Sequence, residues 1–340
     1  MLQTDGSVWG TGNNIFGQLG DGTKTMKRFF TITMTRGVYS ACAGGFHSLL
    51  VKQDGSAWGT GRNLNGQLGD GTKDNRISFV QIMPDSTQAV AAGGSHSLLL
   101  KSDGSVWSTG SNMHGQLGDG STANKITFEK VIGDAQAIAA GQLHSLVLKH
   151  DGSVWATGWN NFGQLGDNSI CDSNNFKKVM DPQNGSGSTF AKAVAAGYGH
   201  SLILKQDGTV WTAGNNLYGQ LGDGSNIDKS TFEHVFSDAK AVAAGFGHSL
   251  VLKEDSSVWA TGWNLHGQLG EKSKRREFNS FMQVIPTGAL SIAAGAHHSM
   301  VLMKDHNVFG TGNNFMGQLG CSNNSVVILK EFAMTFGGAS

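Results

Sequence analysis

The sequence predicts an all-β protein: a seven-bladed β-propeller with four-stranded antiparallel blades, whose ring is closed by pairing of the N- and C-terminal strands. Three observations predict this fold. The loop sequence N-x-x-G-Q-L-G occurs seven times, an aromatic residue recurs at intervals of 48 to 56 residues, and the two ends of the chain match adjoining parts of one repeat.

Two markers define the repeat. The intervals between aromatic residues and the intervals between the histidines of G-x-x-H-S change together along the chain. The markers are Trp9, Trp58, Trp107, Trp155, Trp211, Trp259 and Phe309, and His47, His96, His144, His200, His248 and His298. The repeat therefore fills residues 1–340, and we expect a single propeller domain.

Residues 193–223 contain one clear unit. AVAAG is small and apolar, which suits a crowded inner strand, and the alternating HSLILK predicts a second strand. Asp-Gly in QDG favours a tight hairpin turn. TVWTAG, with its β-branched and aromatic residues, predicts a third strand. NNLYGQLGDG then connects to an outer strand around DKSTFEHVF, and no stretch has a helical period.

The chain ends predict ring closure. The start, MLQTDG, aligns with LVKQDG at residues 50–55, and the end, AMTFGGAS, aligns with SACAGGFHS. The last blade would take its inner strand from the C-terminus and its middle strands from the N-terminus, which removes exposed strand edges. A fragment of a longer repeat array is the alternative.

Composition restricts the function. Lys and Arg total 25, and Asp and Glu also total 25, so the overall charge gives no reason to expect a nucleic-acid partner. No segment has the length of a membrane span and no signal peptide precedes the first repeat, so no membrane contact is expected. Cys42, Cys171 and Cys321 are too far apart to suggest a disulfide framework. We expect a monomer in the cytoplasm or nucleus.

The unit G-x-x-H-S-L-x-L-K-x-D-G-x-V-W-x-x-G-x-N-x-x-G-Q-L-G resembles the regulator of chromosome condensation repeat, and the resemblance covers all seven units. It implies a seven-bladed propeller. It also implies several functions: nucleotide exchange on a Ran-like small GTPase, scaffolding in ubiquitin ligases, ultraviolet sensing, and protein interaction. The exchange factor's wedge-like insertion and basic tail are not found here, and no Trp precedes the marker histidines, as the ultraviolet sensor would need.

The polar residues that recur in every unit indicate a structural role rather than a catalytic or ligand-binding one. A Gly-rich loop present in every unit is expected to have the same structural role in each unit. No helix start follows the loop, so phosphate binding at a helix N-terminus is not expected. Histidines spread around a ring are too far apart to share one metal ion, so each is expected to hydrogen-bond an adjacent blade. The Asp of G-D-G does not meet the calcium-loop pattern. We therefore predict no catalytic residue, no cofactor and no metal.

Two groups of residues are candidates for binding a partner. The G-x-x-H turns and the N-x-x-G-Q-L-G loops are expected to share one face, where an apolar patch would combine Phe46, Leu143, Tyr198 and Phe246 with Phe16, Phe162 and Tyr218. The alternative is that these side chains pack under the loops as core. The second group is the basic run Lys272, Lys274, Arg275 and Arg276. The insertion at 181–189 is expected on the opposite face.

These observations predict a non-enzymatic scaffold that binds one or more proteins. A guanine nucleotide exchange factor for a Ran-like small GTPase and the substrate-binding propeller of a ubiquitin ligase are the alternatives that the resemblance implies.

Overall fold

The computed structural model describes residues 1–181, 190–273, 275–321 and 328–337, and these ranges contain strands and turns but no helix. The chain divides into two compact units, each of which is described by itself. The first consists of Met1–Trp159 and Asp172–Met180, and the second consists of Asn160–Cys171 and Asp181–Ser340.

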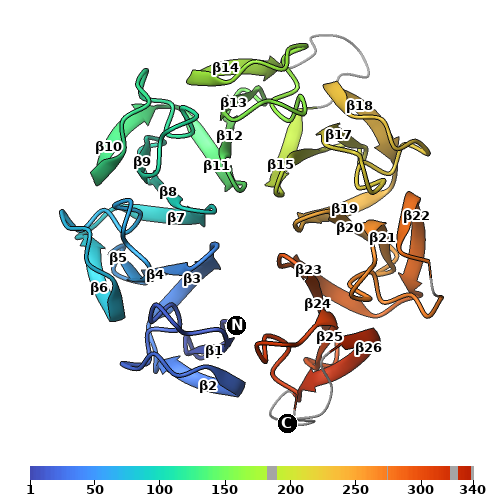
Figure 1. Ribbon diagram of the computed structural model, residues 1–340, viewed down its shortest axis with the longest axis horizontal. Helices are drawn as coiled ribbons and strands as arrows, with labels where there is room; N and C mark the ends of the chain where they lie inside the picture. Colours follow the sequence, from blue (N-terminus) through green and yellow to red (C-terminus); the bar gives the residue numbers. More distant parts are fainter. Residues whose placement is uncertain (182–189, 274, 322–327, 338–340) are drawn as a thin grey trace. The chain divides into compact units, whose positions relative to one another are not determined.

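The first unit contains one two-stranded sheet and three four-stranded sheets (Figure 1). The two-stranded sheet pairs β1 (Val8–Gly12) with β2 (Lys27–Met34). The four-stranded sheets are β3 (Val38–Ala43), β4 (His47–Lys52), β5 (Ala57–Gly61) and β6 (Arg76–Met83); β7 (Thr87–Ala92), β8 (His96–Lys101), β9 (Val106–Gly110) and β10 (Lys125–Ile132); and β11 (Ala135–Ala140), β12 (His144–Lys149), β13 (Val154–Gly158) and β14 (Ser173–Met180).

The second unit contains three four-stranded sheets. They are β15 (Ala191–Ala196), β16 (His200–Lys205), β17 (Val210–Gly214) and β18 (Lys229–Phe236); β19 (Ala239–Ala244), β20 (His248–Lys253), β21 (Val258–Trp263) and β22 (Glu277–Ile285); and β23 (Ala289–Ala294), β24 (His298–Met303), β25 (Val308–Asn313) and β26 (Ile328–Phe336).

Each four-stranded sheet is a propeller blade whose strands follow one another in chain order and pair antiparallel. In the blade β15–β18, Val194 of the inner strand lies opposite Ile203, and Ile203 lies opposite Trp211. The strand order predicted from residues 193–223 is therefore confirmed. The hairpin between β16 and β17 turns at Gly208, whose φ of 81° suits a residue without a Cβ.

The second strand of four blades, β8, β12, β16 and β20, is more buried than its alternating sequence predicts. Every residue from His96 to Leu100 in β8 is buried. Leu99 packs with Leu49 and Leu68 of the preceding repeat, whereas Leu98 and Leu100 pack with residues of the following blade. Burial does not alternate because both faces of this strand contact a neighbouring blade. The inner strands, in contrast, are mostly half-buried, so small residues there do not mark a fully enclosed strand.

The hydrophobic core lies between successive blades, and the loop leucines complete it. In the second unit, Leu202 and Leu204 pack with Ala239 and Val251 of the next blade. The Leu of G-Q-L-G is fully buried in six loops, including Leu221, whose burial between blades the sequence predicts. Burying one such side chain stabilises the fold by about 1.5–3 kcal/mol.

Six complete blades are described, together with a two-stranded sheet at the N-terminus. Met1 and Trp9 exchange backbone hydrogen bonds of 2.7 and 2.8 Å, and Leu2 bridges to Val8. Residues 1–9 therefore form a hairpin in the register that the alignment with residues 50–55 predicts. Residues 333–336, which the alignment assigns to the inner strand of the last blade, instead belong to β26 and pair with β25 as the outer strand of the preceding blade, so that assignment is wrong. Residues 338–340 lie outside the described residues, and the seventh blade and the ring closure stay predictions.

Candidate functional site

The N-x-x-G-Q-L-G loop is held together by its own polar side chains. In the loop that begins at Asn216, the side-chain Nδ2 lies 3.0 Å from Asp223 Oδ1 and 3.1 Å from the Ser225 carbonyl oxygen. Asn216 Oδ1 accepts the backbone N–H of Leu221 at 3.0 Å, and Gln220 Oε1 accepts that of Tyr218 at 3.0 Å. The repeated Asn, Gln and Asp thus satisfy backbone groups and position the buried Leu.

The Asp of the loop is a carboxylate with a structural role. Asp223 Oδ2 lies 3.6 Å from Lys229 Nζ, and Oδ1 accepts the Ser225 N–H at 2.9 Å. Burial acts to raise the pKa of Asp223, but the hydrogen bonds from Ser225 and Asn216 and the charge of Lys229 outweigh it, so the pKa lies below its ordinary value. Among the described residues, no group of three or more His, Cys, Asp or Glu side chains is arranged to hold a metal ion.

The marker histidines connect adjacent blades, as the sequence predicts. The Nε2 atoms of His47, His96, His200 and His248 lie 2.9 to 3.0 Å from the Oγ atoms of Ser97, Ser145, Ser249 and Ser299 on the following blades. Each serine in turn donates to the backbone carbonyl of a loop Gln, for example Ser249 to Gln220 at 2.7 Å. A serine whose only proton is committed in this way accepts from the histidine and is not a nucleophile activated by it.

The turns and loops share one face of each blade, called here the loop face. In the second unit, the N–H of Asn215 donates to the Gly199 carbonyl at 2.7 Å, and that of Trp263 donates to the Gly247 carbonyl at 2.7 Å. The Asp-Gly hairpins lie with the outer-to-inner connections on the other face, where Ala239 N–H donates to the Gly208 carbonyl at 2.9 Å. Both placements agree with the sequence prediction.

Two of the predicted partner-binding residues lie in the first unit. Phe46 is 36% exposed, and its ring contacts Phe16 edge-on at 5.4 Å between centroids. The Arg62 guanidinium lies 5.6 Å from the Phe16 ring centroid. Leu143 is half-buried. The structure thus brings together Phe16 and Phe46 from successive repeats.

The other two predicted aromatic residues, Tyr198 and Phe246, contact each other in the second unit, with ring centroids 4.1 Å apart. Phe246 also contacts Trp263 at 6.1 Å, and Trp263 stacks on Tyr218 at 5.0 Å. Two histidines join them, because His297 lies 5.3 Å from Phe246 and His266 lies 5.5 Å from Trp263. The aromatic cluster is defined here as Tyr198, Tyr218, Phe246, Trp263, His266 and His297; all six side chains are half-buried.

The positions of His266 and His297 in the repeat identify them as neighbours of the cluster. The residue before G-Q-L-G contacts the residue before the marker histidine of the next repeat, as Phe16 contacts Phe46 and as His266 contacts His297 at 5.2 Å. Where that second position is glycine, the space is filled by an aromatic ring, and Tyr218 lies over Gly247 in this way. Desolvation, followed by the nearby His266, lowers the pKa of His297.

A further set of side chains was not predicted. The first variable residue of N-x-x-G-Q-L-G is apolar in six of the seven loops, and in those six it is between 43% and 69% exposed. The first unit carries Ile15, Leu64 and Met113, and the second unit carries Leu217, Leu265 and Phe315. Asn161 is the exception.

The predicted basic run lies in the loop that begins at Asn264. Lys272, Arg275 and Arg276 are exposed, and Lys274 lies outside the described residues. Lys272 pairs with Glu331 at 2.9 Å, and the Arg275 guanidinium lies 4.9 Å from the centroid of the Phe278 ring. The Arg276 carbonyl accepts the Asn264 N–H at 2.6 Å, which places Arg276 beside the residue that follows Trp263, and the residue paired with Trp263 itself is Glu277.

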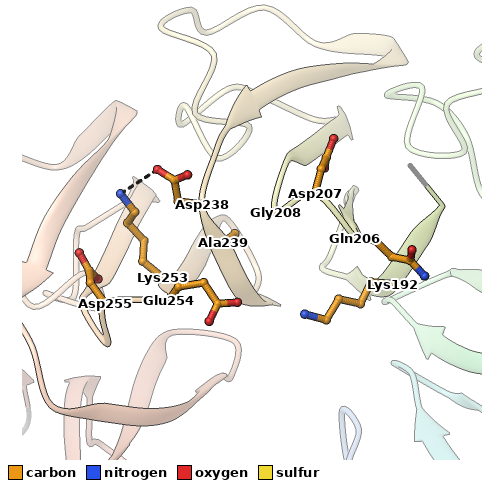
Figure 2. Close-up of a pocket in the computed structure, with 9 residues that line it drawn as sticks. All are labelled: Lys192, Gln206, Asp207, Gly208, Asp238, Ala239, Lys253, Glu254 and Asp255. Atoms are coloured by element: carbon orange, nitrogen blue, oxygen red, sulfur yellow. Dashed lines mark ion pairs between the residues drawn. The ribbon is translucent and has the colours of Figure 1, made fainter. Parts of the chain in front are cut away.

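The hairpin face of the second unit has a pocket of about 490 Å³ (Figure 2). Its lining is polar, with Lys192 and Glu254 on opposite sides, and Lys253 pairs with Asp238 at 3.4 Å. The sequence does not predict this pocket. Its walls carry no aromatic ring to hold a ligand, and part of its charge is paired internally.

No helix in the described parts of the chain is long and apolar enough to cross a membrane. The described cysteines Cys42, Cys171 and Cys321 are free thiols.

Solved structures with a similar fold include human WBSCR16, with a TM-score of 0.85 and 21% sequence identity over 97% of this chain and 93% of that one. Yeast RCC1 (Prp20) bound to Kap60 has a TM-score of 0.83 and 18% identity over 97% of this chain and 84% of that one. Prp20p from Saccharomyces cerevisiae, in a separate structure, has a TM-score of 0.82 and 19% identity over 98% and 87%. No curated protein sequence matches the chain. At these identities the structural likeness establishes the fold alone.

Comparison with models of protein families shows which family the chain belongs to. One model of the regulator of chromosome condensation (RCC1) repeat matches residues 38–67, 88–116, 135–164, 191–220, 239–268 and 290–318. A second model of the same repeat matches residues 54–100, 103–148, 151–204 and 207–252. The first model alone covers more than half of the chain, and its six matches contain the marker histidines that connect the blades. The chain belongs to the regulator of chromosome condensation repeat family.

Proposed function

We propose that the protein is a non-enzymatic interaction module that binds other proteins through the loop face of its blades. The observation that carries the proposal is the exposed apolar residue at one fixed position of six loops. A side chain needed for folding would be buried like the Leu of the same loops, whereas these six lie at the surface. An exposed apolar side chain at the same loop position of six repeats offers surface that a partner can bury.

The proposed architecture is a single seven-bladed propeller spanning residues 1–340, and it acts as a monomer in the cytoplasm or nucleus. The hairpin of Met1–Trp9 and the pairing of β1 with β2 support a seventh blade built on the N-terminal residues. A propeller of this kind offers rigid blades that hold variable loops in place, which suits a scaffold.

The experiment compares three baits in affinity purification with quantitative mass spectrometry: the unsubstituted chain, a triple variant with Leu217→Ser, Leu265→Ser and Phe315→Ser, and a control with Gln206→Ser and Glu254→Ser. The control changes exposed residues of the hairpin face. We expect the triple variant to lose proteins that the other two baits retain. If all three baits retain the same proteins, the loop side chains do not bind partners and the proposal fails.

An exchange factor for a small GTPase is the second candidate. The observation that favours it is the structural likeness to Prp20p, whose reported binding properties concern Gsp1p and histones. The test is release of labelled GDP from a panel of small GTPases with and without the protein. Acceleration would establish exchange activity in place of a passive scaffold. No described residue adds support to the ubiquitin-ligase alternative.

A further inference from the structure

We infer that the aromatic cluster and the adjacent basic residues Arg275 and Arg276 form one docking site for an acidic segment of a partner protein that carries an apolar anchor side chain. This inference rests on the proposed function and specifies the chemistry of one partner. It concerns the second unit only.

The apolar half of the site is centred on Trp263. Its ring contacts four others: Tyr218 at 5.0 Å, Phe246 at 6.1 Å, His266 at 5.5 Å and His297 at 5.1 Å. These residues come from different repeats, and mutual contact fixes their orientation before a ligand arrives. Rigid, half-exposed aromatic rings are the groups that dominate binding energy at protein interfaces.

Trp263 is not required by the repeat. The position immediately before the first Asn of the loop holds Asn13, Arg62, Ser111, Trp159, Asn215 and Asn313 in the other units. The loops fold alike with all these residues, because each follows the same Gly and precedes the same Asn. A large ring that the fold does not need, placed at the surface among other rings, indicates binding.

Exposed aliphatic side chains extend the apolar half. Leu217 precedes Tyr218 and is 60% exposed, and Leu265 precedes His266 and is 43% exposed. Aliphatic side chains offer no stacking plane for nucleic-acid bases and no partner for phosphate, but they bury well against an apolar side chain of a protein. This observation favours a protein segment over a single-stranded nucleic acid.

The basic half of the site lies in a blade that lacks the ion pair formed elsewhere between the outer strand and the loop Asp. In β2, β6, β10 and β18, the residue opposite the Gly that ends the third strand is Lys or Arg. That cation pairs with the loop Asp, as Arg76 does with Asp70 at 2.6 Å. In β22 the corresponding residue is Phe278, and the loop acid is Glu271. In this loop Glu271 therefore has no Lys or Arg at that strand position to pair with.

Arg275 and Arg276 have no carboxylate within ion-pair distance among the described residues. Their backbone carbonyls hold Asn264, at 3.3 Å from its Nδ2 and 2.6 Å from its N–H respectively, so the segment is fixed beside Trp263. Two guanidinium groups without a carboxylate partner, next to an apolar platform, complement a segment in which Asp or Glu residues flank an aromatic or aliphatic residue.

The experiment selects 12-residue peptides from a random phage-displayed library on the immobilised full chain. We expect enriched peptides to carry net negative charge around an aromatic or aliphatic residue. The best peptide is then synthesised with a fluorescein label, and its affinity is measured by fluorescence anisotropy. Arg275→Ser with Arg276→Ser should weaken binding about tenfold and flatten its salt dependence.

Matched variants separate the two halves of the site from general effects. Leu265→Ser, and separately Phe246→Ser, should weaken binding at least as much without changing the salt dependence. The control Lys192→Ser with Lys240→Ser removes the same charge from exposed positions on the inner strands β15 and β19 and should leave the affinity unchanged. Thermal melting of each variant shows that the fold is retained.

In the peptide selection, enrichment of neutral or basic peptides, or no enriched peptide, would overturn the inference. In the affinity measurements, an equal loss in the lysine control would overturn it, as would tighter binding of a 15-nucleotide oligouridylate than of the peptide. Self-association in light scattering that the arginine variant abolishes would also overturn it. Each of these can occur while the affinity purification with the triple loop variant still loses partners. In that case the proposed function stands and only the chemistry assigned to this site is wrong.

Discussion

His248 and Ser299 join two successive blades of the second unit through a buried hydrogen bond of 3.0 Å between Nε2 and Oγ. Ser299 Oγ also lies 2.7 Å from the Gln268 carbonyl oxygen, which can only accept. The serine proton therefore goes to Gln268, and His248 donates its Nε2 proton to Ser299. One residue pair thus ties together two blades and the loop between them. Burial of the ring, with no hydrogen-bond partner at Nδ1, favours the neutral imidazole and lowers the pKa of His248.

Replacing Ser299 by Ala should destabilise the protein. The substitution leaves the His248 N–H and the Gln268 carbonyl buried without a partner, and each unsatisfied group costs about 1–3 kcal/mol. The free energy of unfolding, measured by urea denaturation, should fall by that order. Ser291→Ala, at an exposed position of β23, is the control and should change the stability little. Equal effects of the two substitutions would contradict the role assigned to Ser299.

Acid should destabilise the protein before its carboxylates are protonated. Desolvation by burial lowers the pKa to about 4 for His47, His200 and His298 and to about 3 for His96 and His248. The unfolded chain binds protons near pH 6.5 while the folded chain resists them, so stability is constant above that pH for these groups. It should fall as the pH drops from 6.5 toward about 4.

The measurement is the urea midpoint at several pH values between 8 and 4. A His248→Asn variant, less stable at neutral pH, should show a shallower decline because one buried titrating group is gone. An unfolding free energy that stays constant between pH 7 and pH 5 would show that the histidines are not buried as neutral groups.

Gly222→Ala should be far more damaging than Gly224→Ala, two residues later in the same loop. Both glycines have a positive φ, 74° and 83°. A Cβ on Gly222 would collide with the Phe281 ring, whereas the nearest atom to a Cβ on Gly224 is Ser280 Oγ at 3.8 Å. Backbone strain alone costs about 1–2 kcal/mol, and overpacking adds about 1–3 kcal/mol. Thermal denaturation of the pair distinguishes the two contributions. Equal melting temperatures would exclude the clash.

Asn216→Ala should cost more than Asn264→Ala. The Asn216 amide lies within hydrogen-bond distance of Asp223, Ser225 and the Ile227 carbonyl. In both residues Oδ1 accepts the backbone N–H of the loop Leu, but the Asn264 Nδ2 has only the Arg275 carbonyl, at 3.3 Å, among the described partners. With a net value of about 1 kcal/mol per hydrogen bond, the difference should exceed 1 kcal/mol in urea denaturation. A larger loss for Asn264→Ala would show that the basic loop depends on its Asn as much as the regular loops do.

The candidate site could be predicted only in part. Tyr198 and Phe246 are named by their place beside the marker histidines, and they do contact each other. Trp263, His266 and His297 are not predicted as members of the same cluster, because their contacts depend on how the loop of one repeat packs against the turn of the next. The repeat pattern marks the positions of His266 and His297, but only the packing shows that these two positions meet.

The sequence by itself determined the blade: the order of its four strands, the buried Leu221 of its loop and the histidine that bonds the next blade. These features depend on hydrogen bonds and apolar periodicity that recur in every repeat, so seven copies of the pattern specify them. Only the tertiary structure decided that both faces of β8 are buried, that six rings from different repeats, Trp263 among them, form one cluster, and that Arg275 and Arg276 are left without a carboxylate. The physical reason is that these are contacts between variable side chains of neighbouring repeats, and their distances follow from the packing of one blade on another.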